Sequence, residues 1–291
     1  MPLTAALNVQ SGAMPDSEYL QSVQAWRLAL DADIRRPRGL LALSGLLWLQ
    51  KGTNTIGSSR DCTICLPKPV PRLLGAFDFD GARVTFSVDI GQVVDIDGAA
   101  VQSVSLLRFE DENGASLLRS GDLEMALTRH AGRVGLRVWN AARAREFPPR
   151  SWFDVDERYL IRAAYTAYPV PVQIRMPDAG GEIQRGYVQG YVSFKLAGKS
   201  YNLEATETDD GRLFLQLRDR TNGIQTYPEG RYMHTEAVSE DGKVVVDFNK
   251  ACNPPSAFTQ FTTCTFAPKE SALNCEIEAG EHFVGAPPAG R

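Results

Sequence analysis

The segment Val192–Leu217, VSFKLAGKSYNLEATETDDGRLFLQL, decides the fold class of this chain. Apolar and polar residues alternate in it twice, with the apolar positions at Val192, Phe194 and Leu196 and then at Leu213, Leu215 and Leu217. A period of two is that of a β-strand with one buried face. The pairs Ala197-Gly198 and Asp210-Gly211 favour tight turns at either end of the middle run. The segment therefore predicts antiparallel strands joined by hairpins.

Turn-forming residue pairs of the same kind recur along most of the chain after Pro37. Further turn pairs are Asp80-Gly81, Ile90-Gly91, Asp97-Gly98, Asn113-Gly114, Ala131-Gly132, Asn222-Gly223 and Asp241-Gly242. A further alternating run has apolar residues at Val84, Phe86, Val88 and Ile90. Before Pro37 the pattern differs, because apolar residues recur at steps of three and four from Asp16 to Arg36. We expect one amphipathic helix there, capped by Asp16 or Ser17, and a mainly β body.

The paired prolines of REFPPRSW, residues 145–152, separate two hairpin systems and indicate a domain boundary. We predict an N-terminal segment with one helix at 1–37, a β-domain at 38–146, a second β-domain at 147–284 and a frayed tail at 285–291. The second domain is expected to be an antiparallel barrel or sandwich.

Composition limits the classes of function. The 291 residues are 43% hydrophobic, enough for real cores, and 31 basic residues against 35 acidic ones give a net charge of −4. This balance speaks against nucleic acid as a partner. No secretory leader pattern is present and no apolar run approaches the roughly 18 residues of a membrane span. We expect a cytoplasmic protein without a membrane partner, whose five cysteines are reduced.

The stretch DFNKACNPPSAF, residues 247–258, is the first candidate site. If the strand KVVVDFN continues through it, Asp247 and Asn249 share one face. The prolines at 254 and 255 cannot donate to a β-ladder, so the strand must end by Asn253. Two interpretations stay open: the three polar side chains border an open pocket, or they fix a prolyl turn by Asx bonds to backbone.

The stretch RDRTNGIQTYPEGRYM, residues 218–233, is the second candidate. Asp219 continues the leucine face of the preceding strand, and a carboxylate directed at an apolar interior needs a partner, for which Arg231 is available. The pair is either a structural bridge or a binding site in which Arg231 and the Tyr227 hydroxyl contact an anionic or carbonyl group. Glu281, in EAGEH, is either an exposed acid or the partner of Asp247 in general acid–base catalysis.

Other chemistries find little support. The chain has no G-x-S-x-G, Walker or G-x-G-x-x-G motif and only three separated histidines. Cys62-Thr63-Ile64-Cys65 has no second pair, and the spacings of Cys252, Cys264, Cys275 and His282 match no zinc-finger pattern. We therefore predict neither a metal site nor a cofactor. A basic cluster is either a solvated or interdomain face or a site for a phosphate-bearing ligand; it consists of Arg129, Arg133, Arg137, Arg143, Arg145 and Arg150, with His130 among them.

The chain resembles an uncharacterised, mainly microbial family known only as a domain of unknown function. The resemblance rests on GLLALSGLLWLQKGTNTIGSS, GRVGLRVWN, SWFDVDERYLIRAAY, TYPEGRYM, DFNKACNPPSAF, CTFAP and EAGE, which span about Trp26 to Glu281. It implies no activity. Cys252 stands where the family pattern has tyrosine, and Ser256 stands where it has cysteine, while Cys264 matches. A role that depends on a cysteine at position 256 therefore does not carry over.

A weaker resemblance concerns the first β-domain. GTNTIGSSRDCTICLP, residues 52–67, is similar to the opening of a forkhead-associated (FHA) β-sandwich. Ser58 occupies the place of the arginine that would hold a phosphate, so the resemblance implies the fold rather than phosphopeptide binding.

These observations lead to one functional hypothesis and one rival. The first is a hydrolytic enzyme acting on an unknown small molecule, with Asp247 and Glu281 as catalytic residues. The binding residues would be Asp219, Tyr227, Arg231, Asn249 and Asn253. The rival is a noncatalytic binding or interaction module with an FHA-like domain, in which the same residues serve the structure.

Overall fold

The computed structural model describes residues 17–66, 70–110, 114–130, 132–179, 181–262 and 264–283. The turns expected at Asn113 and Ala131, the cap at Asp16 and the tail at 285–291 involve residues outside these ranges. The chain forms two compact units: unit 1 comprises Met1–Ala29, Arg150–Pro254 and Thr265–Gly285, and unit 2 comprises Leu30–Pro149, Pro255–Cys264 and Ala286–Arg291. No helix among the described residues is long and apolar enough to cross a membrane.

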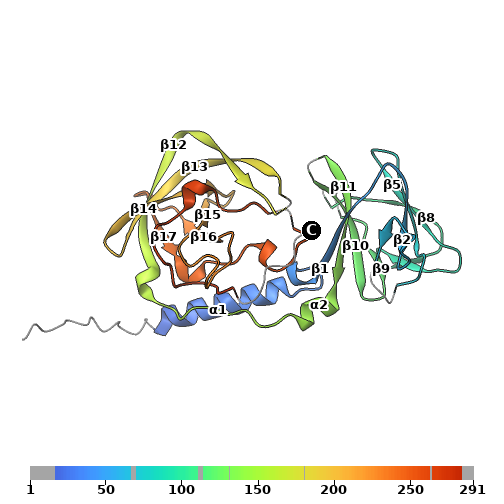
Figure 1. Ribbon diagram of the computed structural model, residues 1–291, viewed down its shortest axis with the longest axis horizontal. Coiled ribbons are helices and arrows are strands. Elements are labelled where there is room, and N and C mark those ends of the chain that lie inside the picture. The colour runs from blue at the N-terminus through green and yellow to red at the C-terminus, as the bar shows by residue number, and fades with distance from the viewer. Residues whose placement is uncertain are drawn as a thin grey trace, which may run out of the picture. The chain divides into compact units, whose positions relative to one another are not determined.

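Strands dominate both units, and the expectation of a mainly β protein with one N-terminal helix is confirmed (Figure 1). The long helix α1 covers Ser17–Ile34, within the predicted 16–36, and a short helix α2 covers Ala141–Glu146. The strands of unit 2 are β1 Leu43–Trp48, β2 Gly52–Gly57, β3 Ile64–Cys65, β4 Gly75–Phe79, β5 Val84–Val88, β6 Val94–Ile96, β7 Ala99–Val101, β8 Val104–Leu107, β9 Leu118–Ser120, β10 Leu123–His130 and β11 Arg133–Asn140. The strands of unit 1 are β12 Leu160–Pro177, β13 Ile183–Leu196, β14 Lys199–Glu207, β15 Arg212–Leu217, β16 Arg231–Ala237 and β17 Lys243–Asp247. Five single turns of 3₁₀-helix complete the described elements: η1 Leu40–Ala42, η2 Glu157–Tyr159, η3 Phe248–Lys250, η4 Pro255–Ala257 and η5 Lys269–Ser271.

Unit 2 is a β-sandwich. One sheet has the order β1-β11-β10-β9-β6-β7 and the other the order β3-β2-β4-β5-β8. The short strands β2 and β3 pair in parallel, and the other neighbouring strands that the structure describes in this unit are antiparallel. Residues from both sheets form one hydrophobic core, in which the side chains of Phe77, Phe86, Met125 and Leu136 are fully buried. Such a core is what the alternation of apolar residues along each strand requires, because one face of each sheet is removed from water.

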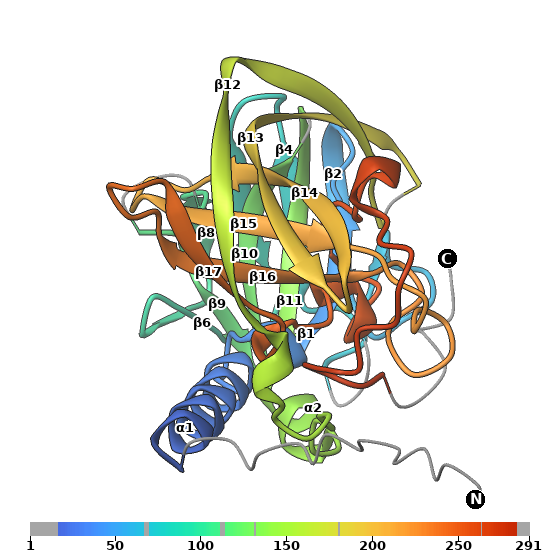
Figure 2. The ribbon, with the colours of Figure 1, turned by 90° about the vertical axis from the view of Figure 1, so that its left-hand side faces the viewer.

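Unit 1 is a single antiparallel sheet with the order β16-β15-β14-β13-β12-β17. Its two end strands, β16 and β17, contact each other, so the sheet curls into a nearly closed barrel (Figure 2). The alternating residues of the quoted segment point into it: Val192, Leu213, Leu215 and Leu217 are all 0% exposed. Leu273, Ile277 and Ala279 of the C-terminal segment fill the remaining interior. Side chains and this segment together occupy the inside of the barrel.

The turn chemistry explains the hairpin between β13 and β14. Ala197 and Gly198 have φ of 49° and 77°, both in the left-handed region that a two-residue type I′ turn demands. Gly198 adopts this region without cost, while Ala197 is one of the two non-glycine residues with positive φ among those the structure describes.

Two local expectations fail. Ile90 is 96% exposed because β5 ends at Val88 and residue 90 lies in the turn that follows. The strand that was expected to continue to Asn249 ends at Asp247, where a 3₁₀ turn over Phe248–Lys250 begins.

Candidate functional site

Asp219 and Arg231 form an ion pair inside the barrel of unit 1. The Arg231 Nη2 atom lies 2.8 Å from Asp219 Oδ2, and both side chains are 0% exposed. Arg231 is the first residue of β16, and Asp219 lies two residues after β15. The pairing of these two strands places Leu217 opposite Arg231, which brings the two side chains to the same end of the barrel.

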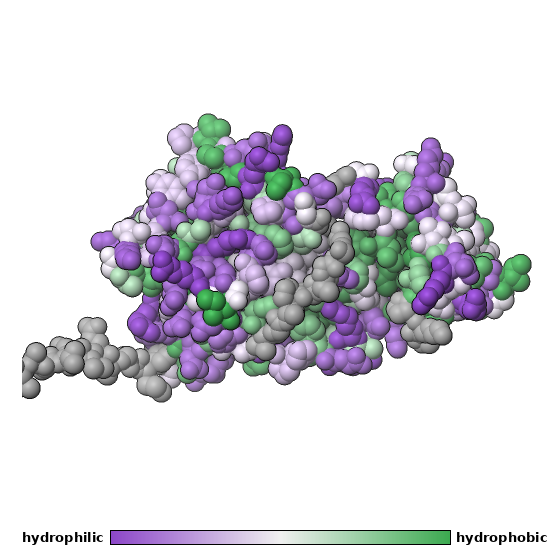
Figure 3. All heavy atoms as spheres, in the orientation of Figure 1, coloured by the Kyte–Doolittle hydropathy of each residue, from purple (hydrophilic) through white to green (hydrophobic). Residues whose placement is uncertain are grey.

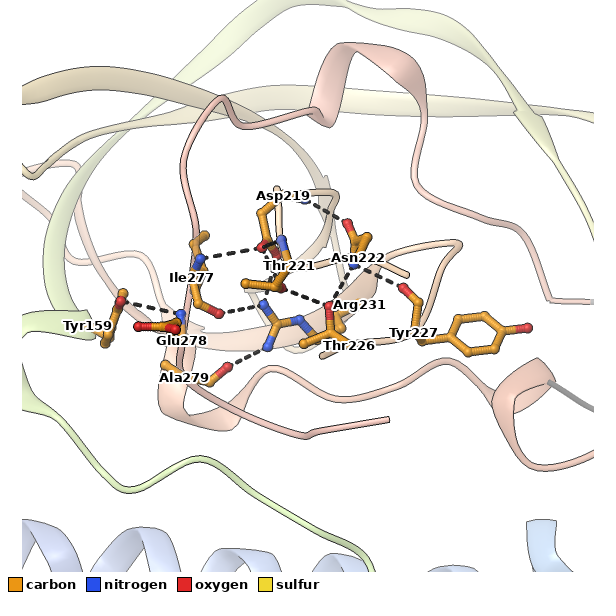
Figure 4. A network of polar contacts seen from close by, with 10 residues as sticks. All are labelled: Tyr159, Asp219, Thr221, Asn222, Thr226, Tyr227, Arg231, Ile277, Glu278 and Ala279. Atoms are coloured by element: carbon orange, nitrogen blue, oxygen red, sulfur yellow. Dashed lines mark hydrogen bonds and ion pairs between the residues drawn. The ribbon is translucent and has the colours of Figure 1, made fainter. Parts of the chain in front are cut away.

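Backbone groups bind the rest of this pair (Figure 4). Arg231 donates from Nη2 to the Ile277 carbonyl at 2.9 Å and from Nη1 to the Ala279 carbonyl, while Nε has no hydrogen-bond partner among the described residues. Asp219 Oδ1 accepts from the Thr221 N–H at 2.8 Å and the Thr221 hydroxyl at 2.5 Å. The pair therefore ties the C-terminal segment into the barrel, and the backbone bonds offset part of the cost of removing both charges from water.

The Tyr227 hydroxyl does not contact the Asp219–Arg231 pair. The carbonyl of this residue accepts from the Asn222 side chain at 2.9 Å, its ring packs edge-on against Phe283 with centroids 5.0 Å apart, and it is 5% exposed. Figure 4 shows its hydroxyl directed away from Arg231. The Tyr227 hydroxyl and the Arg231 guanidinium thus point in different directions, and a ligand that contacts both stays a prediction.

Asp247 and Asn249 meet through a turn rather than along a strand. The Asp247 Oδ1 atom accepts from the Asn249 N–H at 3.1 Å and so caps the 3₁₀ turn that ends β17. The Asn249 side chain is 0% exposed; its Oδ1 accepts from the Asp156 N–H at 3.0 Å and its Nδ2 donates to the Asp156 carbonyl at 2.9 Å. The Asn249 side chain thus supplies hydrogen-bond partners to both the N–H and the carbonyl of Asp156, a role that Asx side chains often have.

Helix α1 supplies two partners that the sequence did not single out. The Tyr19 hydroxyl donates to Asp247 Oδ1 at 2.8 Å and accepts from Asn249 Nδ2 at 3.0 Å. Burial and the neighbouring Asp247 carboxylate raise the pKa of Tyr19. Arg27 donates from Nη2 to the Asn249 carbonyl at 3.3 Å, and burial lowers the pKa of its guanidinium.

Glu281 is held by Arg150. Nε and Nη2 of Arg150 lie 2.7 and 2.5 Å from the two carboxylate oxygens, and the side chains of Arg150 and Glu281 are 3% and 2% exposed. The Asn253 N–H also donates to Glu281 Oε2 at 2.9 Å, and the Asn253 Nδ2 donates to the His282 carbonyl at 2.9 Å. The Oδ1 atom of Asn253 has no hydrogen-bond partner among the described residues. The prediction of an exposed Glu281 is wrong, because the Arg150 fork and a backbone N–H bind the carboxylate inside the unit.

Cys252 lies beside this pair and is 3% exposed. Burial, together with the charge of Glu281, raises the pKa of the Cys252 thiol to about 12. A thiol in such surroundings is inert as a nucleophile, since the thiolate is the reactive form.

The candidate residues consequently form three partner sets. Asp219 belongs with Arg231, Asp247 and Asn249 belong with Tyr19, and Glu281 belongs with Arg150 and Asn253. Among the described residues, no hydrogen bond or ion pair joins Asp247 to Glu281. The structure thus places the two carboxylates expected to act as acid and base in separate sets.

The basic cluster is likewise distributed over separate contacts. In unit 2, Arg129 stacks on Phe109 at 3.4 Å and Arg133 on Trp48 at 4.0 Å. Arg137 pairs with Glu110 at 3.0 Å, and Arg143 donates to the Leu41, Leu43 and Phe258 carbonyls. Ser58, at the place of the FHA arginine, donates from its hydroxyl to the Pro71 carbonyl at 3.2 Å.

All five cysteines are free thiols. Within the part of the chain that the structure describes, no group of three or more His, Cys, Asp or Glu side chains is arranged to hold a metal ion.

Two of the clefts on the described surface of unit 2 are large enough for a small molecule. One, of about 500 Å³, is lined by Arg36, Pro37, Arg38, Glu110, Arg119, Glu124 and Trp139. The other, of about 550 Å³, is lined by Gly52, Asp78, Phe79, Asp80, Arg83, Thr85 and Leu106. In the first cleft, Arg119 pairs with Asp95 at 3.0 Å and with Glu124 at 3.2 Å. Arg38 approaches Glu124 only to 3.6 Å and its side chain is 58% exposed.

Comparison with known proteins supports the family resemblance. Residues 145–282 match the model of a family described as "Protein of unknown function (DUF1684)". One similar solved structure is the NMR structure of an uncharacterized protein from gene locus rrnAC0354 of Haloarcula marismortui, with 29% identity, a TM-score of 0.40 and coverage of 48% of this chain and 80% of that one. Another is the FhaA FHA domain complexed with the intracellular domain of Rv3910, with 20% identity, a TM-score of 0.22 and coverage of 32% and 96%. No curated protein is significantly similar to the chain.

Proposed function

We propose that the chain is a noncatalytic binding protein and that the polar residues of unit 1 stabilise its fold. The observation that carries this proposal is the burial of Arg231 and Glu281, whose side chains are 0% and 2% exposed and are bonded to protein groups. A catalytic acid or a substrate-binding guanidinium must come within hydrogen-bond distance of the reacting molecule. A small molecule reaches neither side chain without breaking a buried ion pair.

The ligand site that this proposal favours is the 500 Å³ cleft of unit 2. Its volume lies within the range of small-molecule sites. Arg119 is engaged by two carboxylates, whereas the exposed Arg38 has one long contact, so Arg38 has donors available for a carboxylate or phosphate group. The ligand class is therefore a small anion.

A thermal-shift and calorimetry series with citrate, inorganic phosphate and AMP tests this assignment. We expect at least one of them to bind, and Arg38→Gln to weaken binding by about tenfold or more, the effect of one lost charge-assisted hydrogen bond. Arg83→Gln is the matched control, because its side chain is 76% exposed and lines the other cleft.

A separate assay tests whether the protein lacks catalytic activity. Chromogenic carboxylic ester, phosphate ester and amide substrates should show no turnover above the background of the heat-denatured protein. Turnover that disappears in Glu281→Gln, with the melting temperature unchanged, would refute the proposal.

A further inference from the structure

The outer half of the β12–β13 hairpin is a two-stranded ribbon in unit 1. Strand β17 pairs with β12 only over Leu160–Ala164, and β14 pairs with β13 only from Gly190 onward. Val172–Pro177 and Ile183–Val188 therefore pair with each other and extend beyond the rest of the sheet. The wide bulge between Ala167 and Val172 contains Pro169 and Pro171, which cannot donate to the ladder.

One face of this ribbon carries two arginines directly opposite each other. Arg175 and Arg185 are cross-strand partners, and directly opposed residues of an antiparallel pair point to the same side. Both residues are exposed, and neither has an ion pair or a side-chain hydrogen bond within the described part of the chain. Like charges in this arrangement destabilise a sheet. Elsewhere in unit 1, the exposed Arg162 pairs with Asp241 and the exposed Arg212 pairs with Asp210.

The ribbon also concentrates exposed apolar and aromatic side chains. On the face of the arginines, Ile183 is 51% and Tyr187 54% exposed, and on its other face Val172 is 44% exposed. Val170, in the bulge, is 71% exposed. Figure 3 shows strongly hydrophilic and hydrophobic side chains next to each other over the β12–β13 arch. Of the acidic residues nearby, Glu182 lies in the connecting turn rather than among the paired positions, and Asp178 is buried.

We propose that this face docks on an anionic membrane surface, with Arg175 and Arg185 binding the phosphate groups of lipids. Two planar guanidinium forks about 5 Å apart at their Cβ atoms can share or bridge phosphates. A lipid surface also offers an environment for Ile183 and Tyr187, since tyrosine and apolar side chains favour the interface between headgroups and acyl chains. A nucleic acid would satisfy the arginines but would leave the aliphatic side chains in water. The absence of long apolar runs argues against a membrane-spanning segment. It does not argue against docking on the membrane surface.

Co-sedimentation of the full chain with sucrose-loaded vesicles tests this proposal. We expect binding to vesicles of phosphatidylglycerol and phosphatidylcholine and no binding to phosphatidylcholine alone. Arg175→Gln with Arg185→Gln should reduce the partition coefficient about 30-fold, from the usual contribution of a basic residue near an anionic leaflet. The matched control is Arg162→Gln with Arg212→Gln, which removes the same charge from exposed but ion-paired residues and should change partitioning far less.

Further variants and ligands distinguish membrane docking from binding of phosphate or nucleic acid. Ile183→Ser with Tyr187→Ser should weaken vesicle binding while leaving both arginines in place. The Arg175→Gln, Arg185→Gln protein should melt at the same temperature as the unmodified chain or higher, because a repulsion is removed. The proposal is overturned if both arginine pairs affect vesicle binding equally, or if the chain binds no anionic vesicles. Binding of inorganic phosphate or of a single-stranded oligonucleotide through the same arginines, without vesicle binding, would assign the face to that ligand instead.

Discussion

Replacement of Asp219 by alanine should be among the most damaging single substitutions in unit 1. It leaves the Arg231 guanidinium, whose side chain is 0% exposed, without its counter-ion. It also deprives the Thr221 N–H and hydroxyl of their acceptor. Breaking a buried ion pair from one side typically costs about 3–5 kcal/mol, because the remaining charge cannot be solvated. We expect a loss of that size in the free energy of unfolding of unit 1.

Urea unfolding followed by tryptophan fluorescence measures this loss. In a Trp48→Phe, Trp139→Phe background only Trp26 and Trp152 report, and these lie in unit 1 with their rings 5.9 Å apart. Arg162→Ala is the control, because its pair with Asp241 is exposed and should contribute within about 0.5 kcal/mol. Adding Arg231→Met to Asp219→Ala should restore part of the loss, since the stranded charge is gone. A loss below about 1 kcal/mol for Asp219→Ala would refute the argument.

Other side chains give independent tests. Partial removal from water, with Arg212 nearby, lowers the pKa of His234 below its ordinary 6.5, although the residue is exposed on β16. Its contribution to stability is therefore present above pH 6.5 and is lost as the pH falls, and His234→Gln should flatten the decline in unfolding free energy between about pH 7 and pH 5. A thiol reagent at about pH 8 should modify the exposed Cys65 in the native protein. It should reach the buried Cys252, whose pKa is raised to about 12, only after unfolding, and rapid labelling of Cys252 in the native protein would contradict its burial. Tyr19→Phe removes two hydrogen bonds, one of them to a carboxylate, and should cost about 1–3 kcal/mol in unfolding free energy. An unchanged denaturation midpoint would show that helix α1 does not stabilise Asp247.

The fold was largely predictable because its signals are local. Alternation at Leu213, Leu215 and Leu217 depends only on which face of a strand is buried, and all three are 0% exposed. The pair Ala197-Gly198 likewise marks a turn whose backbone requirement involves those two residues alone. The failure at Ile90 concerns an element boundary, where alternation continues by chance into a turn.

The candidate site was less predictable because its partners are distant along the chain. Asp247 binds Tyr19, 228 residues away, and Arg150 binds Glu281, 131 residues away. Alternation suggested that Asp247 and Asn249 share a strand face, yet the same residues meet because the Asp247 carboxylate caps a turn. A carboxylate that competes for backbone N–H groups can end a strand, and period alone does not report that competition.

The most direct measurement for the structural role of the buried polar residues is the melting temperature of Glu281→Gln beside that of the unmodified chain. The substitution keeps the shape and removes the charge that the Arg150 fork binds at 2.5 and 2.7 Å. We expect a lower melting temperature, corresponding to a loss of about 3 kcal/mol or more in unfolding free energy, because Arg150 is left as a buried charge without its counter-ion. Active-site residues are commonly retained at a cost in stability, so an unchanged or higher melting temperature for Glu281→Gln would contradict the account and favour a catalytic carboxylate.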